Sequence, residues 1–256
     1  MYSGRLQLER MNGRVFAAIF KRELRSYFST PIALIFLTVF LVLTGFFTFK
    51  LGAFYELGQA DLRAFFVWHP WLYLFIVPAI SMRVWAEERK SGTLELLLTL
   101  PVSLVEAALG KFAAGWVFLG FALFLTFPIV FTVCYLGDPD LGLVFASYLG
   151  SFLMAGTFLA IGCGVSASTN NQVIAFVIAT TICLVLILLG FDPVVGMMLE
   201  VLPPRLVEHV SALSFPQHFE GIQRGIVELT DIFYFLALMA LGLLAGVIII
   251  ERKKAD

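Results

Sequence analysis

The stretch Glu87–Ser103, EERKSGTLELLLTLPVS, lies between two long apolar runs and decides how the rest of the chain is interpreted. Its charged start is followed by Gly92 and then by a leucine-rich segment, Thr93–Leu100, which Pro101 ends. This order predicts a helix of about two turns, with Glu95 near the positive end of the helix dipole. At about 1.5 Å per residue, such a helix is too short to cross a membrane core of about 30 Å.

The leucines of this segment form an apolar surface that should not face water. Leu94, Leu97 and Leu98 share one helical face through their i, i+3 and i+4 spacing. The helix could lie in an apolar groove of a partner protein, which is a common mode of recognition. It could also lie flat at the lipid interface or pack on the chain's own helices, and the residues alone leave these three alternatives open.

The composition is that of a membrane protein. Apolar residues make up 60% of the chain and charged residues 14%, whereas soluble domains contain about 25% charged residues. The net charge of −1 and the lack of a basic stripe argue against nucleic acid as a partner. The three cysteines fall inside apolar runs and are expected to be small packing residues, not a disulfide or metal set. The expected surroundings are a lipid bilayer.

Six apolar runs are each close to the roughly 20 residues that a spanning helix needs. They are Ile32–Phe49, Ala64–Met82, Phe112–Leu136, Leu141–Val165, Gln172–Gly190 and Ile232–Ile250. The sequence therefore predicts an all-α polytopic membrane protein with six transmembrane helices in a single domain over residues 1–256.

Residues 15–30, before the first run, are amphipathic. Lys21, Arg22 and Arg25 point away from the apolar face, as expected for a helix that lies in the membrane interface with its cations toward lipid headgroups.

The lysines and arginines predict the orientation of the chain. With the N-terminus in the cytoplasm, most of the 17 lie on the cytoplasmic side. The exceptions are Lys50, Arg63, Arg205 and Arg224. The positive-inside rule therefore places both termini and the loop 83–111 in the cytoplasm.

The connection 191–231, between the fifth and sixth runs, is too long to be a turn. Its apolar patches and prolines predict two or three short helices that form an extracytoplasmic hairpin dipping into the outer leaflet, stabilised by Arg224 and Gly225. The hairpin could be a substrate gate or a structural lid. His209 and His218 lie within it and could suggest a metal, or they could be isolated loop histidines.

The sequence lacks the motifs of an enzyme or a self-powered transporter. Gly110 and Lys111 are not followed by Ser or Thr, and Val105 stands where a phosphate-binding loop needs its first glycine. The six runs contain no Asp, Glu, Lys or Arg, which ion-coupled transporters place near the middle of the membrane. We therefore expect no catalytic residue, no metal and no bound cofactor on this chain, and an energy source outside it.

The stretch ERKSGTLELLLTLPVS resembles the cytoplasmic loop of ABC exporter permeases of the type-2 class, in particular those of the gliding-motility branch. The resemblance extends from FKRELRSYFSTP (Phe20–Pro31) to ERKK (Glu251–Lys254), and LSFPQHFEGIQRGIVELTD (Leu213–Asp231) also matches. It implies an N-terminal elbow helix, a cytoplasmic coupling helix and a location in the bacterial inner membrane. It also implies two partners: an ABC-type nucleotide-binding subunit that holds ATP and Mg, and a second permease subunit, identical or different.

Under this resemblance the leucine-rich helix docks on the nucleotide-binding subunit and moves as a lever when ATP is hydrolysed. The residues expected at this contact are Glu87, Glu88, Arg89, Gly92, Thr93, Leu94, Glu95, Leu97, Leu98 and Pro101. A different class of function stays open: a membrane scaffold of a motility, secretion or maturation complex that transports nothing itself. An intramembrane enzyme is a weaker alternative, since no nucleophile and base are visible.

Overall fold

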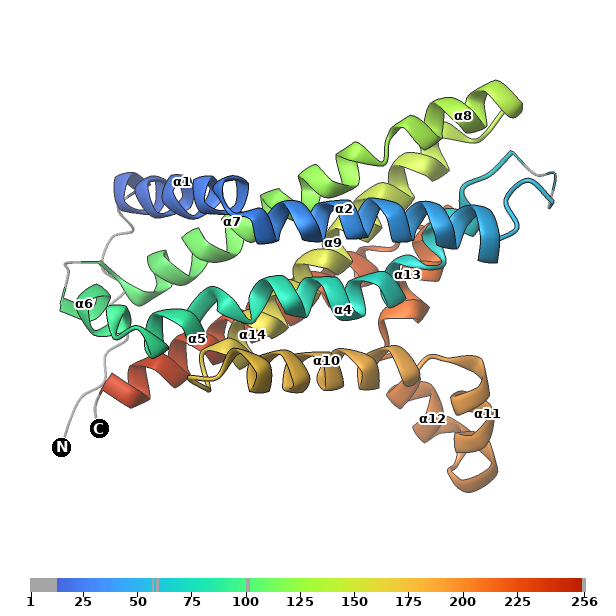
Figure 1. Cartoon of the computed structure of the whole chain (residues 1–256). Coiled ribbons are helices and arrows are strands. Elements are labelled where there is room, and N and C mark those ends of the chain that lie inside the picture. The colour runs from blue at the N-terminus through green and yellow to red at the C-terminus, as the bar shows by residue number, and fades with distance from the viewer. Residues whose placement is uncertain (1–12, 57, 59, 100–101, 255–256) are drawn as a thin grey trace.

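A computed structural model describes residues 13–254, apart from 57, 59, 100 and 101 (Figure 1). The described residues form helices and no strands, so the all-α prediction is confirmed. In chain order the helices are α1 (Gly13–Ser29), α2 (Pro31–Phe46), the short π-helix η1 (Phe47–Leu51), α3 (Arg63–Phe66), α4 (His69–Ser81), α5 (Arg83–Lys90), α6 (Thr93–Thr99), α7 (Leu104–Leu125), α8 (Pro128–Leu136), α9 (Leu141–Ser166), α10 (Gln172–Leu188), α11 (Asp192–Val201), α12 (Pro204–Ser211), α13 (Phe215–Gln223) and α14 (Leu229–Lys254).

Five helical segments among the described residues are long and apolar enough to cross a membrane. They are Ala33–Leu51, Arg63–Lys90, Leu104–Leu136, Leu141–Ser166 and Leu229–Arg252. A sixth span results only if α10 and α11, which are bent by 72° where they meet, form one broken span. Pro193 in the first turn of α11 is suited to starting a new helix in a different direction. The structure thus contains candidate helices for five of the six predicted spans, and the remaining one depends on this bent pair.

Two helices extend beyond the boundaries that the sequence indicated. The helix of the second run continues through α5 to Lys90, so the charged start of the loop belongs to the end of a helix. The helix of the third run begins at Leu104, because Ser103 and Glu106 form a reciprocal capping box there. As a result, Lys111 lies inside α7 and not in a loop before it.

Helix α9 forms the centre of the bundle. It contacts α4, α7, α10, α13 and α14, and 72% of its most apolar stretch is buried, against 17% for the segment that contains α2. Small residues allow α14 to come close to it. A Cβ added at Gly164 would lie 2.6 Å from the carbonyl oxygen of Gly242, and one added at Gly242 would lie 2.7 Å from the backbone of Ala160. This is the close packing that small residues permit in membrane proteins.

The region 191–231 contains the three short helices α11, α12 and α13, as predicted. They differ in how they pack. α13 buries Phe215, Phe219 and Ile222 and contacts α9 and α14, whereas α11 buries no residue. α13 is thus part of the bundle, and Gly225, with a φ of +83°, turns the chain toward α14.

The histidines of this region make local contacts. Nδ1 of His218 lies 2.7 Å from a carboxylate oxygen of Asp231, and Nδ1 of His209 lies 2.6 Å from the carbonyl oxygen of Arg205. Within the part of the chain that the structure describes, no group of three His, Cys, Asp or Glu residues could hold a metal ion.

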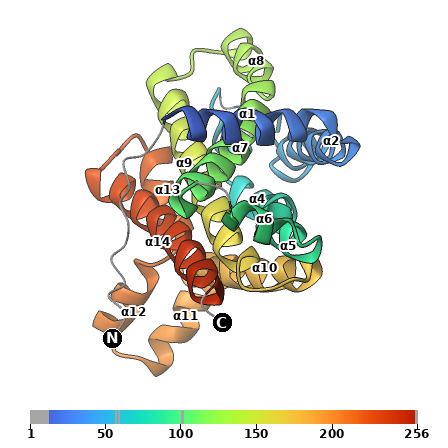
Figure 2. The same ribbon diagram turned by 90° about the vertical axis from the view of Figure 1, so that its left-hand side faces the viewer.

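The bundle is elongated and has two ends, at which different helices and helix ends lie (Figure 1). The start of α1, the α5–α6 corner and the end of α14 lie at one end, and α8, α11 and α12 lie at the other. Figure 2 looks onto the first of these ends, where α1 crosses in front of α7 and α6 lies beside α5. The candidate site is built at this end.

Candidate functional site

A sharp turn joins α5 to α6. Gly92 has a φ of +71°, in the left-handed region that glycine adopts readily and other residues do not. The Ser91 hydroxyl donates to the carbonyl oxygen of Glu87 at 2.9 Å and lies 2.9 Å from the Thr93 hydroxyl oxygen. These hydrogen bonds fix the direction in which α6 leaves α5.

Among the described side chains of α6, Leu94 holds the helix on the bundle. Leu94 is 7% exposed and belongs to a small apolar cluster that also contains Ile19 of α1 and Trp85 of α5. The next two residues, Glu95 and Leu96, face outward, and Leu96 is 66% exposed. Of the sequence alternatives, packing on the chain's own helices therefore holds for Leu94, while Leu96 remains available for a contact outside the chain.

The rest of the predicted contact cannot be placed in the same way. The side chains of Leu97 and Leu98, and the whole of Leu100 and Pro101, fall outside the residues that the structure describes. Their role in binding a partner stays a prediction.

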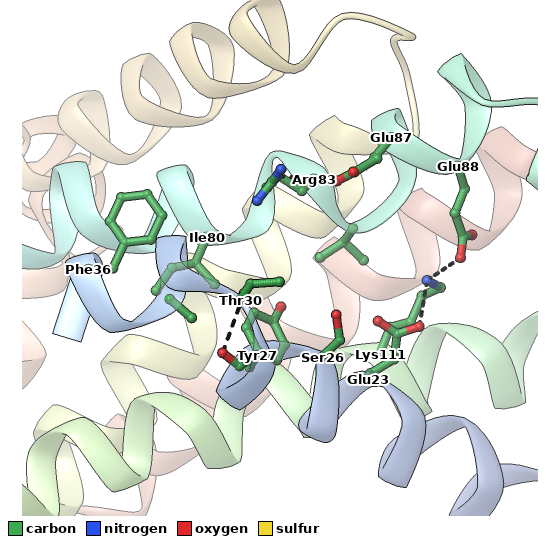
Figure 3. Close-up of a pocket in the computed structure, with 12 residues that line it drawn as sticks. Glu23, Ser26, Tyr27, Thr30, Phe36, Ile80, Arg83, Glu87, Glu88 and Lys111 are labelled. Atoms are coloured by element: carbon green, nitrogen blue, oxygen red, sulfur yellow. Dashed lines mark hydrogen bonds and ion pairs between the residues drawn. The ribbon is translucent and has the colours of Figure 1, made fainter.

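A cluster of four charged side chains joins α1, α5 and α7. Figure 3 shows three of them, Glu23, Glu88 and Lys111. The Lys111 ammonium, whose side chain is 4% exposed, lies 2.6 Å from Glu88 Oε1 and 3.2 Å from Glu23 Oε1. Arg22 completes the cluster at 2.6 Å from Glu23 and 3.6 Å from Glu88. The Trp85 ring centroid is 5.2 Å from Lys111 Nζ, within the range of a cation–π contact. Two cations and two carboxylates therefore balance one another where three helices meet.

The two cations keep the carboxylate of Glu23 ionised. Burial favours its neutral form, but the charges of Lys111 and Arg22 and their hydrogen bonds outweigh this, so the pKa of Glu23 lies below its ordinary value of 4.5. The pKa of Arg22 is raised, chiefly by its hydrogen bond to Glu23. Both groups are thus charged at neutral pH.

The start of α5 is fastened to the end of α9. The backbone amides of Trp85 and Ala86 donate to the Ser166 hydroxyl oxygen at 3.1 and 3.0 Å. The same hydroxyl donates to the carbonyl oxygen of Met82 at 2.8 Å. Ser166 thereby satisfies amides that a helix start would leave without a partner. Through these hydrogen bonds Ser166 connects the start of α5 to the central helix, α9.

A cavity of about 260 Å³ lies beside the charge cluster, between α1, α2, α5 and α7 (Figure 3). Its wall is polar on one side, where Arg83 lies 3.2 Å from Glu87, and apolar on the other, where Phe36 and Ile80 line it. The cavity lies between parts of α1 and α5, and these two helices are joined through the charge cluster and through the apolar cluster of Ile19 and Trp85.

The remaining predicted site residues are spread along α5 and α1. Arg89 is partly buried. Lys21 and Arg25 are exposed on α1, and their contact with lipid headgroups stays a prediction. Arg22 is exposed too, but its guanidinium contacts the two glutamates of the cluster.

The sequence did not indicate Glu23 and Lys111 as site residues. The available signals were weak: Glu23 is the only acidic residue within Gly13–Ser29, and Lys111 is a single cation between apolar segments.

The comparison with protein families settles the class of this protein. The model of the ABC-2 family transporter protein matches residues 72–248, which include the α5–α6 corner, Lys111 and the central helix. The chain belongs to the ABC-2 transporter family. It is therefore a multi-pass permease subunit of an ABC transporter, which works in the membrane with an ATP-binding subunit. A search of curated proteins found no match.

In this ABC-2 permease, the α5–α6 corner has no set of groups suited to bond-making chemistry among its described residues. It offers instead a rigid turn, an anchored short helix and connections to α1, α7 and α9. Such an arrangement can transmit a displacement.

Proposed function

We propose that this ABC-2 permease is the membrane subunit of an exporter of the gliding-motility-like branch, and that a separate ATP-binding subunit drives it through α6. The observation that carries the proposal is the division of α6 into a buried residue, Leu94, and an exposed pair, Glu95 and Leu96, at one end of the bundle. Leu94 holds the helix on the permease, and the exposed pair is free to contact the partner.

The connections of α5 explain how a push on α6 would reach the spans. Closure of the ATP-binding subunits would displace α6, and the turn at Gly92 would pass the displacement to α5. α5 is connected to α7 and α1 through the ion pairs of Lys111 with Glu88 and Glu23, and to α9 through the hydrogen bonds of Ser166. Rigid elements that share such contacts move together, and the bundle would open outward by repacking.

The other parts of the transporter lie outside this chain. A second permease, identical or different, would complete the pathway across the membrane. ATP and Mg would be held by the partner, and the permease itself would have no ATPase activity. We place the complex in the bacterial inner membrane with both permease termini in the cytoplasm, as the distribution of Lys and Arg indicates.

The docking role of α6 is tested by placing a charge on its exposed leucine. Burying a leucine side chain contributes about 1.5–3 kcal/mol, and 1.4 kcal/mol is about tenfold in affinity. The permease is co-expressed with its ATP-binding subunit and is purified through a tag. We expect Leu96→Asp to reach normal membrane levels and to retain at most about one tenth of the ATP-binding subunit.

Two control variants separate docking from folding. Leu206→Asp changes a leucine on α12, at the other end of the bundle, that is 54% exposed, and it should leave co-purification unchanged. Leu94→Asp places a charge in the apolar cluster and should lower expression itself. Normal expression of Leu96→Asp with wild-type co-purification would refute docking through α6. Stable assembly with outer components and no stimulated ATPase would instead favour the scaffold function.

A further inference from the structure

A second cavity, of about 300 Å³, lies near the end of the bundle opposite to α6. Its wall comes from the start of α3, the start of α9 and the end of α13. Candidate spans begin beside it: Arg63 starts one, Asp140 directly precedes another, and the end of α13 leads into the last. The cavity is therefore at the level where lipid headgroups meet the ends of spanning helices.

Two buried polar side chains in this cavity have unused hydrogen-bonding capacity. Ser147 is 3% exposed and Gln223 is 8% exposed, and both line the cavity. Neither side chain is hydrogen-bonded to another residue that the structure describes. Because both residues line the cavity, their hydroxyl and amide groups are available to a polar group that enters it.

Two guanidinium groups stand at the same cavity. Arg63 forms no ion pair with any carboxylate among the described residues. Arg224 bonds to Glu220 at 3.2 Å, in a pair that is more than half exposed. Since a guanidinium carries five N–H donors, most of the donor capacity of both arginines is unused.

Two carboxylates also line the cavity, but the backbone engages them. Oδ1 of Asp140 accepts from the amides of Gly142 and Leu143 at 2.9 and 3.1 Å. Oδ1 of Asp61 accepts from the amide of Arg63 at 3.0 Å. Asp140 is the N-cap of α9, where the free amides and the positive end of the dipole offset its charge, and Asp61 bonds to the backbone just before the short helix α3. The unused capacity of the cavity is thus mainly that of donors.

We propose that this cavity binds a phosphate group, with Arg63 and Arg224 as its charged ligands and Ser147 and Gln223 as neutral donors. Phosphate oxygens accept several hydrogen bonds, and the planar fork of arginine matches their geometry. A phospholipid headgroup and a soluble phosphate ester share this chemistry, and the level of the cavity at the span ends favours the lipid. The site is separate from α6 and does not rest on the coupling mechanism.

The test uses the purified full-length chain and two probes. Native mass spectrometry follows retention of phosphatidylglycerol, and calorimetry follows binding of glycerol 3-phosphate. We expect the double variant Arg63→Gln, Arg224→Gln to bind at least one of the probes about tenfold more weakly than the wild type. Loss with phosphatidylglycerol alone identifies a lipid site, and loss with glycerol 3-phosphate identifies a site open to soluble esters.

Controls keep this test independent of folding. Arg205→Gln removes an exposed arginine of α12 outside the cavity and should leave both measurements unchanged. Ser147→Ala is a second variant that keeps both arginines, and it should weaken binding by a smaller factor. Equal binding of both probes by wild type, double variant and Ser147→Ala would overturn the proposal, as would a wild type that binds neither probe.

Discussion

Replacing Lys111 with methionine would leave two partly buried carboxylates facing one another. Glu23 and Glu88 are 22% and 19% exposed, and Lys111 Nζ lies within 3.2 Å of both. Removing one partner of a buried ion pair costs about 3–5 kcal/mol. Arg22 still reaches both glutamates, so we expect the lower end of this range, about 3 kcal/mol.

The effect should be visible in thermal unfolding of the purified permease. For chains of comparable size, 1 kcal/mol corresponds to about 2–4 °C, so Lys111→Met should lower the melting temperature by about 6–12 °C. The triple variant Lys111→Met, Glu23→Gln, Glu88→Gln removes the uncompensated charges and should recover most of this loss, because neutral groups cost less to bury. If Lys111→Met had the same melting temperature as the wild type, the cluster would not hold α1, α5 and α7 together.

Three further predictions concern the pH dependence, the packing and the orientation of the chain. Because the folded-state pKa of Glu23 is depressed, its ionised form stabilises the protein above about pH 4.5, and this stabilisation is lost as the pH falls through the lowered pKa. The melting temperature of Glu23→Gln should therefore fall less between about pH 5 and pH 3 than that of the wild type, and an identical fall would contradict this. Gly242→Ala should destabilise the protein by about 1–3 kcal/mol, because the new Cβ meets the Ala160 backbone. Gly45→Ala, with open space around its Cβ, should be neutral or stabilising in the same melting assay, and the reverse order would refute the close packing of α9 and α14. In intact cells an impermeant thiol reagent should label Ser211→Cys and not Ser91→Cys, and labelling of Ser91→Cys would reverse the orientation.

The sequence predicted the parts of the fold that depend on local patterns. The structure contains helices of spanning length for five of the six apolar runs, and it contains the short helix that follows Gly92. The fifth run, Gln172–Gly190, is the exception, because α10 is only 17 residues long before the chain bends into α11.

The parts that the sequence did not predict depend on contacts between distant segments. Glu23, Glu88 and Lys111 come from three helices, and no spacing along the chain relates them. The sequence also did not predict that Leu94 faces the bundle. This position depends on Ile19 and Trp85, which lie in other helices and form an apolar cluster with Leu94. The phosphate cavity likewise combines Arg63, Ser147 and Gln223 from three separate helices.

The central claim is that α6 is the contact between this ABC-2 permease and its ATP-binding subunit. A photo-crosslinking amino acid at Leu96 tests it directly, because this side chain is 66% exposed and the helix around it need not change. Irradiation of the co-expressed complex should join the permease to the ATP-binding subunit from position 96, and not from the control position Leu206. Crosslinks from position 96 to lipid alone, in a complex that still contains the ATP-binding subunit, would contradict the account.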